Sequence, residues 1–477
     1  MSNGALPSYV SMAKPNPPTN RAPWYKNTAP TYAGIFLWFV FWSQAPSGGS
    51  GIPGGVLSGG IGTALLGLVI AALLCHFLFY LVPGLLGLKT GLPLYVVGTS
   101  TYGTQGGFLM PGFLMGVLQF GWLGVNAYFS AQALSPLLGS EPSPAAVNII
   151  AILWAMLAAF VGLKGIQYVA KVATFLPVIP IAVLVILLAK TLGGIGSFDA
   201  GKFVAAGVAA NKGQGSGLDF LGVIALSMSF VIGFFATAGA AGVDFGTNSR
   251  DEKDVQMGGL VGIALAGIVS AGAAILIAAG AFGTTGNYGM NPADPVFMGN
   301  IMGSAGAGKT MGLLLAVAAF PSACFSAFIA ANSFKTTLPT VNPFISVGIG
   351  TIVSIVLAVT GWAGRAGVVF TVIGASFGPI CGAMLVDYVL AGNRWAGPRP
   401  GWNVAGWVSW AIGFIVGIAP LMGIANVPAA PLVAFIVGAA VYFALAKAGM
   451  VSAAVDMPGL SKTPAAGGGG APKGAPA

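Results

Sequence analysis

The chain has 477 residues, of which 56% are hydrophobic and only 6% are charged, and its formal net charge is +9. Soluble domains carry roughly 25% charged residues, so this composition excludes a water-soluble fold and indicates an all-α protein that crosses a lipid bilayer many times. The positive charge is interpreted as membrane topology, and no nucleic acid is expected as a partner.

Twelve transmembrane helices are expected, because apolar stretches of about 20 residues, enough to cross the hydrocarbon core, recur along the chain. They lie near 31–56, 59–86, 106–135, 145–164, 169–190, 217–243, 257–283, 309–333, 338–361, 365–391, 403–422 and 427–448. Most of the 19 Lys and Arg residues then fall on the side that holds both termini. Because basic residues favour cytoplasmic loops, we expect both termini in the cytoplasm and the protein in the plasma (inner) membrane.

The expected domain organisation follows the order of the spans. A cytoplasmic N-terminal tail (1–30) precedes a first repeat of five spans (31–191) and a second repeat of five spans (192–391), and two further spans (392–450) lead to a disordered C-terminal tail (451–477). The first 30 residues are polar and rich in proline, so no cleavable signal peptide is expected. The final residues are mostly Pro, Ala, Gly and Lys, with little to bury.

Two spans at corresponding places in these repeats have interrupted patterns. The first runs into a Gly- and Pro-rich segment at 43–60, and the sixth contains a glycine-rich run at 233–242. Such a pair is typical of a five-plus-five inverted repeat, in which freed backbone groups bind ions and substrate near the membrane midplane. For the sixth span, close packing of neighbouring helices against the glycines explains the pattern equally well.

An amide and an aromatic side chain lie one helical turn apart in the third span, at Gln119 and Trp122. Lipid tails offer an amide no hydrogen-bond partner, so Gln119 should face another helix or a cavity. An aromatic side chain beside it favours a planar ligand. The alternative is that Trp122 only packs against its neighbours.

Three parts of the sequence resemble the nucleobase-cation symporter family, most closely its cytosine permease branch. They are GLKTGLP with STYGTQGGFLMPGFLMGVLQFGWLGV (87–93 and 100–125), FFATAGAAGVDFGTNSRDEKDV (234–255) and SFGPICGAMLVDYVLAGNRW (376–395). The resemblance implies twelve helices in the fold of sodium-coupled amino-acid transporters, with helices 1 and 6 broken. It also implies transport, without enzymatic activity and without a cofactor.

The resemblance further implies that a planar base is held between aromatic side chains of the third and sixth spans, at Trp122 and Phe235. Gln119 would supply an amide, which can donate and accept hydrogen bonds at once. The broken sixth span would read the base edge through Thr237 and Ala238, although Thr237 could instead bond back to its own helix. The full set of expected substrate-binding residues is Gln119, Trp122, Phe234, Phe235, Thr237, Ala238, Phe325 and Ser326.

The eighth span departs from the family's pattern. The family's ring-binding amide falls at Phe325, and its sodium-binding hydroxyls fall at Ala323 and Cys324. Sodium prefers oxygen ligands to a thiol, so these residues argue against a conventional sodium site, and a substrate less polar than cytosine fits better. The cation-binding positions that the resemblance leaves are Ser322 and Cys324, with backbone carbonyls near Trp38 and Phe41.

A proton is the alternative coupling ion. His76 in the second span is the candidate proton relay, because an unperturbed imidazole titrates near pH 6.5. A neutral histidine bonded to a neighbouring carbonyl is the simpler reading. Asp244 and Asp387 match family positions at helix ends, where pairing with Arg250 or Arg394 would be structural. With one His and 3 Cys in the chain, no metal or hydrolase site can be assembled.

The run GSAGAGKT at 303–310 has the spelling of a nucleotide-binding P-loop. A working P-loop must follow a buried strand and open a helix, whereas this run lies between two expected spans on the outer side. Nucleotide binding is therefore not expected.

The leading hypothesis is a secondary active transporter that imports a nucleobase or a related planar nitrogen heterocycle (a cytosine-, purine-, hydantoin- or pyrimidine-like ring) by alternating access. A sodium or proton gradient would drive it, so its partners are a small heterocyclic substrate, a coupling cation and the lipid bilayer. The alternative is a membrane sensor or scaffold of the same fold that binds a heterocycle without coupled transport.

Overall fold

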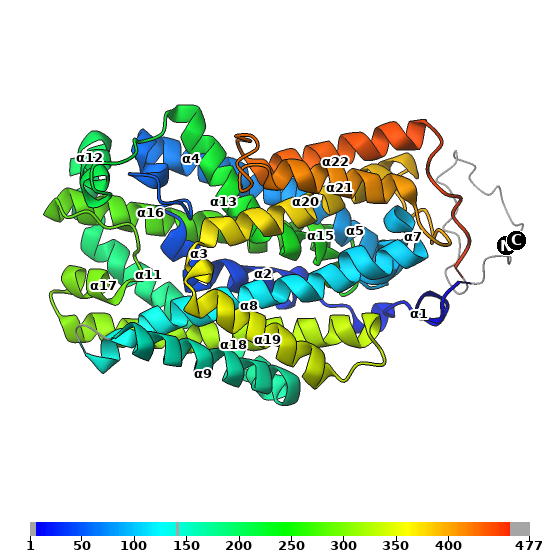
Figure 1. Ribbon diagram of the computed structural model, residues 1–477, viewed down its shortest axis with the longest axis horizontal. Helices are drawn as coiled ribbons and strands as arrows, with labels where there is room; N and C mark the ends of the chain where they lie inside the picture. The colour runs from blue at the N-terminus through cyan, green and yellow to red at the C-terminus, as the bar shows by residue number, and fades with distance from the viewer. Residues whose placement is uncertain (1–5, 140–142, 458–477) are drawn as a thin grey trace, which may run out of the picture.

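The computed structural model of the protein describes residues 6–139 and 143–457. In these residues the backbone forms helices, turns and an isolated β-bridge between Ala22 and Ser249. The long helices run side by side along one axis, with the connecting loops at its two ends (Figure 1). The prediction of an all-α polytopic membrane protein is confirmed.

The α-helices of the first half of the chain are α1 Ser8–Ser11, α2 Thr28–Leu37, α3 Phe39–Gln44, α4 Gly60–Leu74, α5 Leu81–Thr90, α6 Leu94–Val97, α7 Thr99–Gly107, α8 Leu114–Leu134, α9 Pro144–Lys164, α10 Ile166–Ala173, α11 Val178–Thr191 and α12 Ala200–Ala210. Those of the second half are α13 Phe220–Ala240, α14 Gly242–Gly246, α15 Glu252–Gly259, α16 Ala266–Thr285, α17 Pro295–Met302, α18 Ala305–Thr337, α19 Pro343–Val359, α20 Ala366–Leu390, α21 Val404–Ile418 and α22 Ala430–Lys447. Three π-helical segments connect α-helices within longer runs, at Cys75–Tyr80, Phe108–Phe113 and Leu260–Leu265.

Within the described ranges, 9 helical runs are long and apolar enough to cross a membrane. They coincide with the expected spans two to eight, ten and twelve. The other three expected spans correspond to α19, to α21 and to the pair α2 and α3, which are shorter helices. The P-loop-like run falls at the start of α18, directly after helix α17, so the strand that a phosphate loop requires does not precede it.

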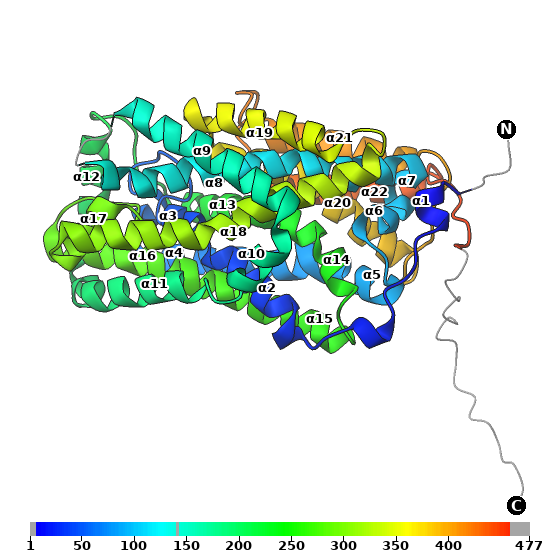
Figure 2. The same cartoon turned by 90° about the horizontal axis from the view of Figure 1, so that it is seen from below.

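Both ends of the described chain lie at one end of the bundle. The two views place α1 and the segment after α22 together, and α12 and α17 at the opposite end (Figure 1, Figure 2). We call these the terminus-bearing end and the far end. An even number of crossings is required for this arrangement.

The outer helices expose large apolar side chains, as a surface that faces lipid requires. On α9, for example, Leu153, Leu157 and Phe160 are each more than half exposed. The interior is formed by α13 and α20, which pack against each other and against α4 and α22. The glycines allow close approach, since a Cβ at Gly233 of α13 would come within 2.6 Å of the Phe370 carbonyl oxygen of α20.

The first span is interrupted at Trp38, earlier than the sequence predicted. Its backbone, at φ −59° and ψ 122°, leaves the helical region between α2 and α3. The indole Nε1 of Trp42 donates to the carbonyl oxygen of Leu37 at 3.3 Å, which satisfies an acceptor near this break. The Gly-rich segment 45–59 is instead a connection of turns and a short 3₁₀ helix.

The sixth span is not unwound over 233–242 as predicted from its glycines. Helix α13 continues to Ala240, and only Ala241 separates it from α14. The reason is packing, because a Cβ at Gly239 would lie 2.8 Å from Cβ of Phe79. Close helix packing, the alternative explanation, accounts for these glycines.

At the terminus-bearing end, two chain segments lie across the loops between helices. In the N-terminal segment, Tyr9 Oη donates to the carbonyl oxygen of Thr104, and the amide of Asn16 donates to the carbonyl oxygen of Thr247 at 3.0 Å. In the C-terminal segment, the backbone amide of Val455 donates to the carbonyl oxygen of Pro398 at 2.9 Å. Most of the predicted disordered tail, 458–477, lies outside the described residues.

A buried ion pair joins Asp387 of α20 to Arg399 in the loop after it, with 2.9 Å between Oδ1 and Nη2. Ser100 and Tyr442 also donate to the Asp387 carboxylate, at 2.7 and 2.8 Å. The suggested pairing with Arg394 is wrong, because the Nε of that residue donates to the carbonyl oxygen of Ala391 instead. The Asp387 carboxylate therefore connects α20 to α7, to α22 and to the loop that holds Arg399.

Candidate substrate site

Four aromatic rings from four separate segments meet near the middle of the bundle. Trp122 of α8 contacts Trp38, Phe234 of α13 and Phe370 of α20, with ring centroids 5.9, 5.2 and 5.4 Å away. We call these residues the four-ring cluster. Trp38 and Phe234 meet the Trp122 ring at steep angles of 69° and 81°, and Phe370 is tilted from it by 34°. A planar ligand can stack on these faces only if the rings separate.

Two polar side chains border this cluster. Trp122 Nε1 donates to Thr237 Oγ1 at 3.4 Å, which links α8 to α13. Gln119 lies one turn before Trp122 on α8 and is 6% exposed, yet the hydrogen bond that its amide nitrogen makes is a weak one, to the Met115 sulfur at 3.7 Å. The structure thus brings Trp122, Phe234 and Thr237 into contact, with Gln119 one helical turn from Trp122 on α8.

Phe235 does not face Trp122 in this structure. Its ring stacks on Phe36 at 5.7 Å and 17° and also contacts Tyr32 at 5.7 Å. The adjacent residue Phe234 provides the ring opposite Trp122, because neighbouring residues on a helix point about 100° apart. The carbonyl oxygen of Ala238 is already engaged, since it accepts a hydrogen bond from Tyr32 Oη at 2.9 Å.

The predicted residues of the eighth span, on α18, are engaged with other helices or with their own. Ser322 Oγ donates to the carbonyl oxygen of Ala319 at 2.7 Å and accepts from Asn126 Nδ2 at 2.9 Å. Ser326 Oγ donates to the Ser322 carbonyl oxygen at 3.2 Å. Cys324 is fully buried, and its backbone lies against Gly162 of α9. Phe325 is half-buried on this helix.

Among the predicted cation-binding positions, the carbonyl oxygen of Trp38 accepts a hydrogen bond from the backbone amide of Phe41 at 2.9 Å. Cys324 offers a thiol in place of an oxygen ligand. The Ser322 hydroxyl is already committed to α8 and to its own helix. Among the described residues, no group of three or more His, Cys, Asp or Glu is arranged to hold a metal ion.

His76 lies in the first π-helical segment and is 3% exposed. Its ring stacks on Tyr80 at 6.0 Å, and its Nδ1 has no hydrogen-bond partner among the described residues. A Cβ at Gly259 would collide with this nitrogen, so helix α15 covers it. The ring contacts of His76 among the described residues are with Phe77 and Tyr80, and none of them is with the four-ring cluster.

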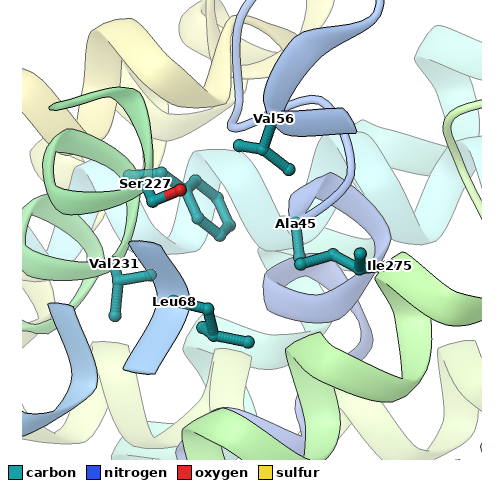
Figure 3. Close-up of a pocket in the computed structure, with 7 residues that line it drawn as sticks. Ala45, Val56, Leu68, Ser227, Val231 and Ile275 are labelled. Atoms are coloured by element: carbon teal, nitrogen blue, oxygen red, sulfur yellow. The ribbon is translucent and has the colours of Figure 1, made fainter. Parts of the chain in front are cut away.

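Two cavities of different size lie within the described residues. A small cavity lies between Ala45, Leu68, Ser227 and their neighbours (Figure 3), and its volume is about 10 Å³. That volume holds at most one water, and the lining is apolar apart from Ser227, so no heterocycle binds there. A larger cavity of about 240 Å³ includes Phe39, Gln132 and Asp294 in its lining. Phe39, the residue after Trp38, lines this larger cavity together with residues of the α16–α17 loop.

Asp244 lies on the opposite side, in the short helix α14, where it accepts a hydrogen bond from the backbone amide of Leu94 at 2.9 Å. Neighbouring atoms remove part of the hydration of the carboxylate, although the residue is exposed overall. This desolvation raises the pKa of Asp244 to about 6, and the hydrogen bond from Leu94 opposes the shift.

Two residues of the cluster were not predicted as side-chain contacts. Trp38 was expected to contribute only a backbone carbonyl, and Phe370 was not expected at all. Trp38 lies in the aromatic run IFLWFVFW, which marks it weakly. Phe370 lies in an apolar span with no local signal, and only the packing of α20 on α13 brings it to Trp122.

The chain is similar to a structure of the transporter Mhp1 in an inward-facing conformation, with a TM-score of 0.66, 16% identity and coverage of 94% of both chains. It is also similar to Mhp1, a nucleobase-cation-symport-1 family transporter, in a closed conformation with bromovinylhydantoin bound (TM-score 0.60, 17% identity, 91% of this chain and 93% of that one).

A third similar structure is a substrate-bound, outward-open Na⁺-coupled sialic acid symporter, with a TM-score of 0.53, 13% identity and coverage of 94% and 93% of the two chains. These likenesses show the shared fold. No curated protein matches the chain by sequence. The model of a family described as permeases for cytosine/purines, uracil, thiamine and allantoin matches residues 52–446. The protein therefore belongs to this family of cytosine/purine, uracil, thiamine and allantoin permeases, which are transporters and not enzymes.

Proposed function

We propose that this permease moves a nucleobase or a related planar heterocycle across the plasma (inner) membrane by alternating access, with both termini in the cytoplasm. The observation that carries the proposal is the contact between the Trp122 and Phe234 rings, one helical turn from Gln119, whose amide nitrogen makes only a weak hydrogen bond to sulfur. A planar ring inserted between aromatic faces gains about 1 to 3 kcal/mol from stacking. The amide then fixes the orientation of the ring.

The substrate enters through the cavity at the α16–α17 loop and reaches the cluster past Phe39. In the present structure the rings of the cluster contact one another, so substrate binding requires that α8 and α13 separate. The hydrogen bond from Trp122 to Thr237 joins these two helices and is exchanged for contacts with the substrate. Release occurs toward the terminus-bearing end. The expected repeats 31–191 and 192–391 supply the moving units.

A sodium or proton gradient drives the transport. The engaged hydroxyl of Ser322 and the buried Cys324 do not provide the oxygen ligands that sodium requires, so a sodium ion would need a different set of oxygens. His76 remains the candidate proton carrier. Uptake measured at two pH values, with sodium or with choline in the buffer, separates the two ions.

The test of the proposed function is uptake of radiolabelled bases and hydantoins into cells that lack their own transporters. Concentrative uptake that depends on Trp122 supports the proposal. Binding without accumulation supports the sensor alternative, and absence of both uptake and binding for the whole panel overturns the proposal.

A further inference from the structure

Trp38 is placed at the centre of the candidate site by the break in the first span. Its backbone leaves the helical region, and its ring lies 5.9 Å from Trp122 and 6.2 Å from Phe234. The side chain is therefore part of the surface that a ligand between Trp122 and Phe234 would touch.

The indole nitrogen of Trp38 differs from those of its neighbours. Trp42 Nε1 donates to the Leu37 carbonyl oxygen, and Trp122 Nε1 donates to Thr237. Trp38 Nε1 is buried, and it has no hydrogen-bond partner among the described residues. A buried donor without a partner lowers stability, because it has lost its bonds to water and gained nothing in return. A buried polar group without a partner calls for an explanation, and a ligand that accepts its hydrogen bond would supply one here.

The other polar groups of the site also offer donors more than acceptors. The amide nitrogen of Gln119 makes only its weak contact with sulfur, and the Thr237 hydroxyl accepts from Trp122. The Ala238 carbonyl oxygen is already taken by Tyr32. Apart from the Gln119 carbonyl oxygen, the described polar groups around the cluster thus favour a ligand edge that accepts hydrogen bonds.

We propose that Trp38 Nε1 donates a hydrogen bond to an exocyclic carbonyl oxygen of the substrate, so that the permease selects planar oxo-heterocycles over rings that carry only amino groups. This inference rests on the proposed function and names the substrate class of the same site. The indole N–H is a donor only, so it forms a hydrogen bond with a carbonyl oxygen but not with the N–H of an amino group at the same position.

The test uses Trp38→Phe, which keeps an aromatic ring and removes the donor. Trp407→Phe is the matched control, because Trp407 Nε1 is also buried without a partner among the described residues but lies on α21 against Gly106. Binding to purified protein is measured with uracil, hydantoin and adenine, and with 2-thiouracil, 4-thiouracil and 2-thiohydantoin, in which a weakly accepting sulfur replaces one oxygen.

The wild-type protein is expected to bind an oxo ring more tightly than adenine and more tightly than one of its thio analogues. Trp38→Phe should weaken binding of the oxo ring roughly three- to tenfold, the usual effect of one neutral hydrogen bond, and should remove the preference over the thio analogue. Trp407→Phe should change neither. The oxo-over-thio preference of the wild type is a second measurement that does not depend on how the variant folds.

Unchanged affinity of Trp38→Phe for the oxo rings would overturn the inference, as would tighter binding of adenine than of uracil and hydantoin. These outcomes leave the proposed function standing, because heterocycle binding is still observed. If the wild type neither binds nor transports any heterocycle, the proposed function fails and this inference fails with it.

Discussion

Trp122 and Thr237 are joined across two helices by a hydrogen bond of 3.4 Å from the indole Nε1 to the hydroxyl oxygen. This bond lies where the rings of Trp122 and Phe234 meet, and it connects α8 to α13. A substrate that separates the two rings must also stretch or replace this bond. Thr237 therefore orients Trp122, and under the proposed function this bond is exchanged for contacts with the substrate.

Replacing Thr237 with Val keeps the shape of the side chain but leaves Trp122 Nε1 without its acceptor. We expect the free energy of unfolding to fall by about 1 kcal/mol and substrate binding to weaken several-fold, because the indole loses its fixed orientation. Thr351→Val is the control, since Thr351 Oγ1 donates to Val347 within its own helix. Ligand titration and thermal unfolding in detergent measure both effects, and equal behaviour of the two variants would contradict the role of Thr237.

Gln119 should be important for binding and unimportant for stability. Its amide nitrogen has only a 3.7 Å contact with the Met115 sulfur, so Gln119→Leu removes little from the folded protein. We expect an unchanged or slightly higher melting temperature together with loss of saturable uptake. Asn126→Leu is the contrasting variant. Asn126 donates to Ser322 and accepts from Trp154, at 2.9 Å each, so this variant should be less stable than the wild type. Retained uptake in Gln119→Leu would remove this residue from the site.

The two adjacent phenylalanines of α13 should behave differently. Phe234→Leu removes the ring opposite Trp122, and we expect weaker binding of the substrate with a modest loss of stability. Phe235→Leu removes the ring that stacks on Phe36, and we expect a loss of about 0.5 to 1.5 kcal/mol in stability with binding less affected. The comparison is made by uptake and thermal unfolding. A larger binding defect in Phe235→Leu would show that this ring turns toward the substrate during transport.

The sequence indicated the helical bundle and the burial of the Gln119 amide, because apolar spans and an amide within one have strong patterns. It did not indicate the break at Trp38, since that residue lies in an unbroken apolar run and the break depends on contacts such as Trp42 with Leu37. The choice of Phe234 over Phe235 is a rotation about the helix axis, which packing against α20 and α2 decides. Glycine content alone also could not distinguish an unwound helix from a closely packed one.

The buried pair of Asp387 and Arg399 should be far more costly to break singly than together. Their side chains are 5% and 8% exposed, so Asp387→Asn or Arg399→Met leaves one buried charge without its partner. Single replacements are expected to lower stability by about 3 to 5 kcal/mol. The double variant should lose much less than the sum of the two. Additive losses in a thermal unfolding series would show that the two residues act independently.

Asp244 should make stability depend on pH between about 4 and 6. Its pKa is raised to about 6 in the folded protein, whereas an aspartate in an unfolded chain titrates near 3.9. In this window the folded protein holds the proton that the unfolded chain has released. The contribution of Asp244 therefore favours folding at low pH and is lost as the pH rises through 6. Because Asp244 is exposed, water screens part of this effect, and stability should change only gradually with pH.

Asp244→Asn should remove this pH dependence. Between pH 7 and pH 5, the melting temperature of the wild type should therefore rise relative to that of the variant. If the melting temperatures of the two proteins change equally over this pH range, the Asp244 carboxylate titrates as it does in water.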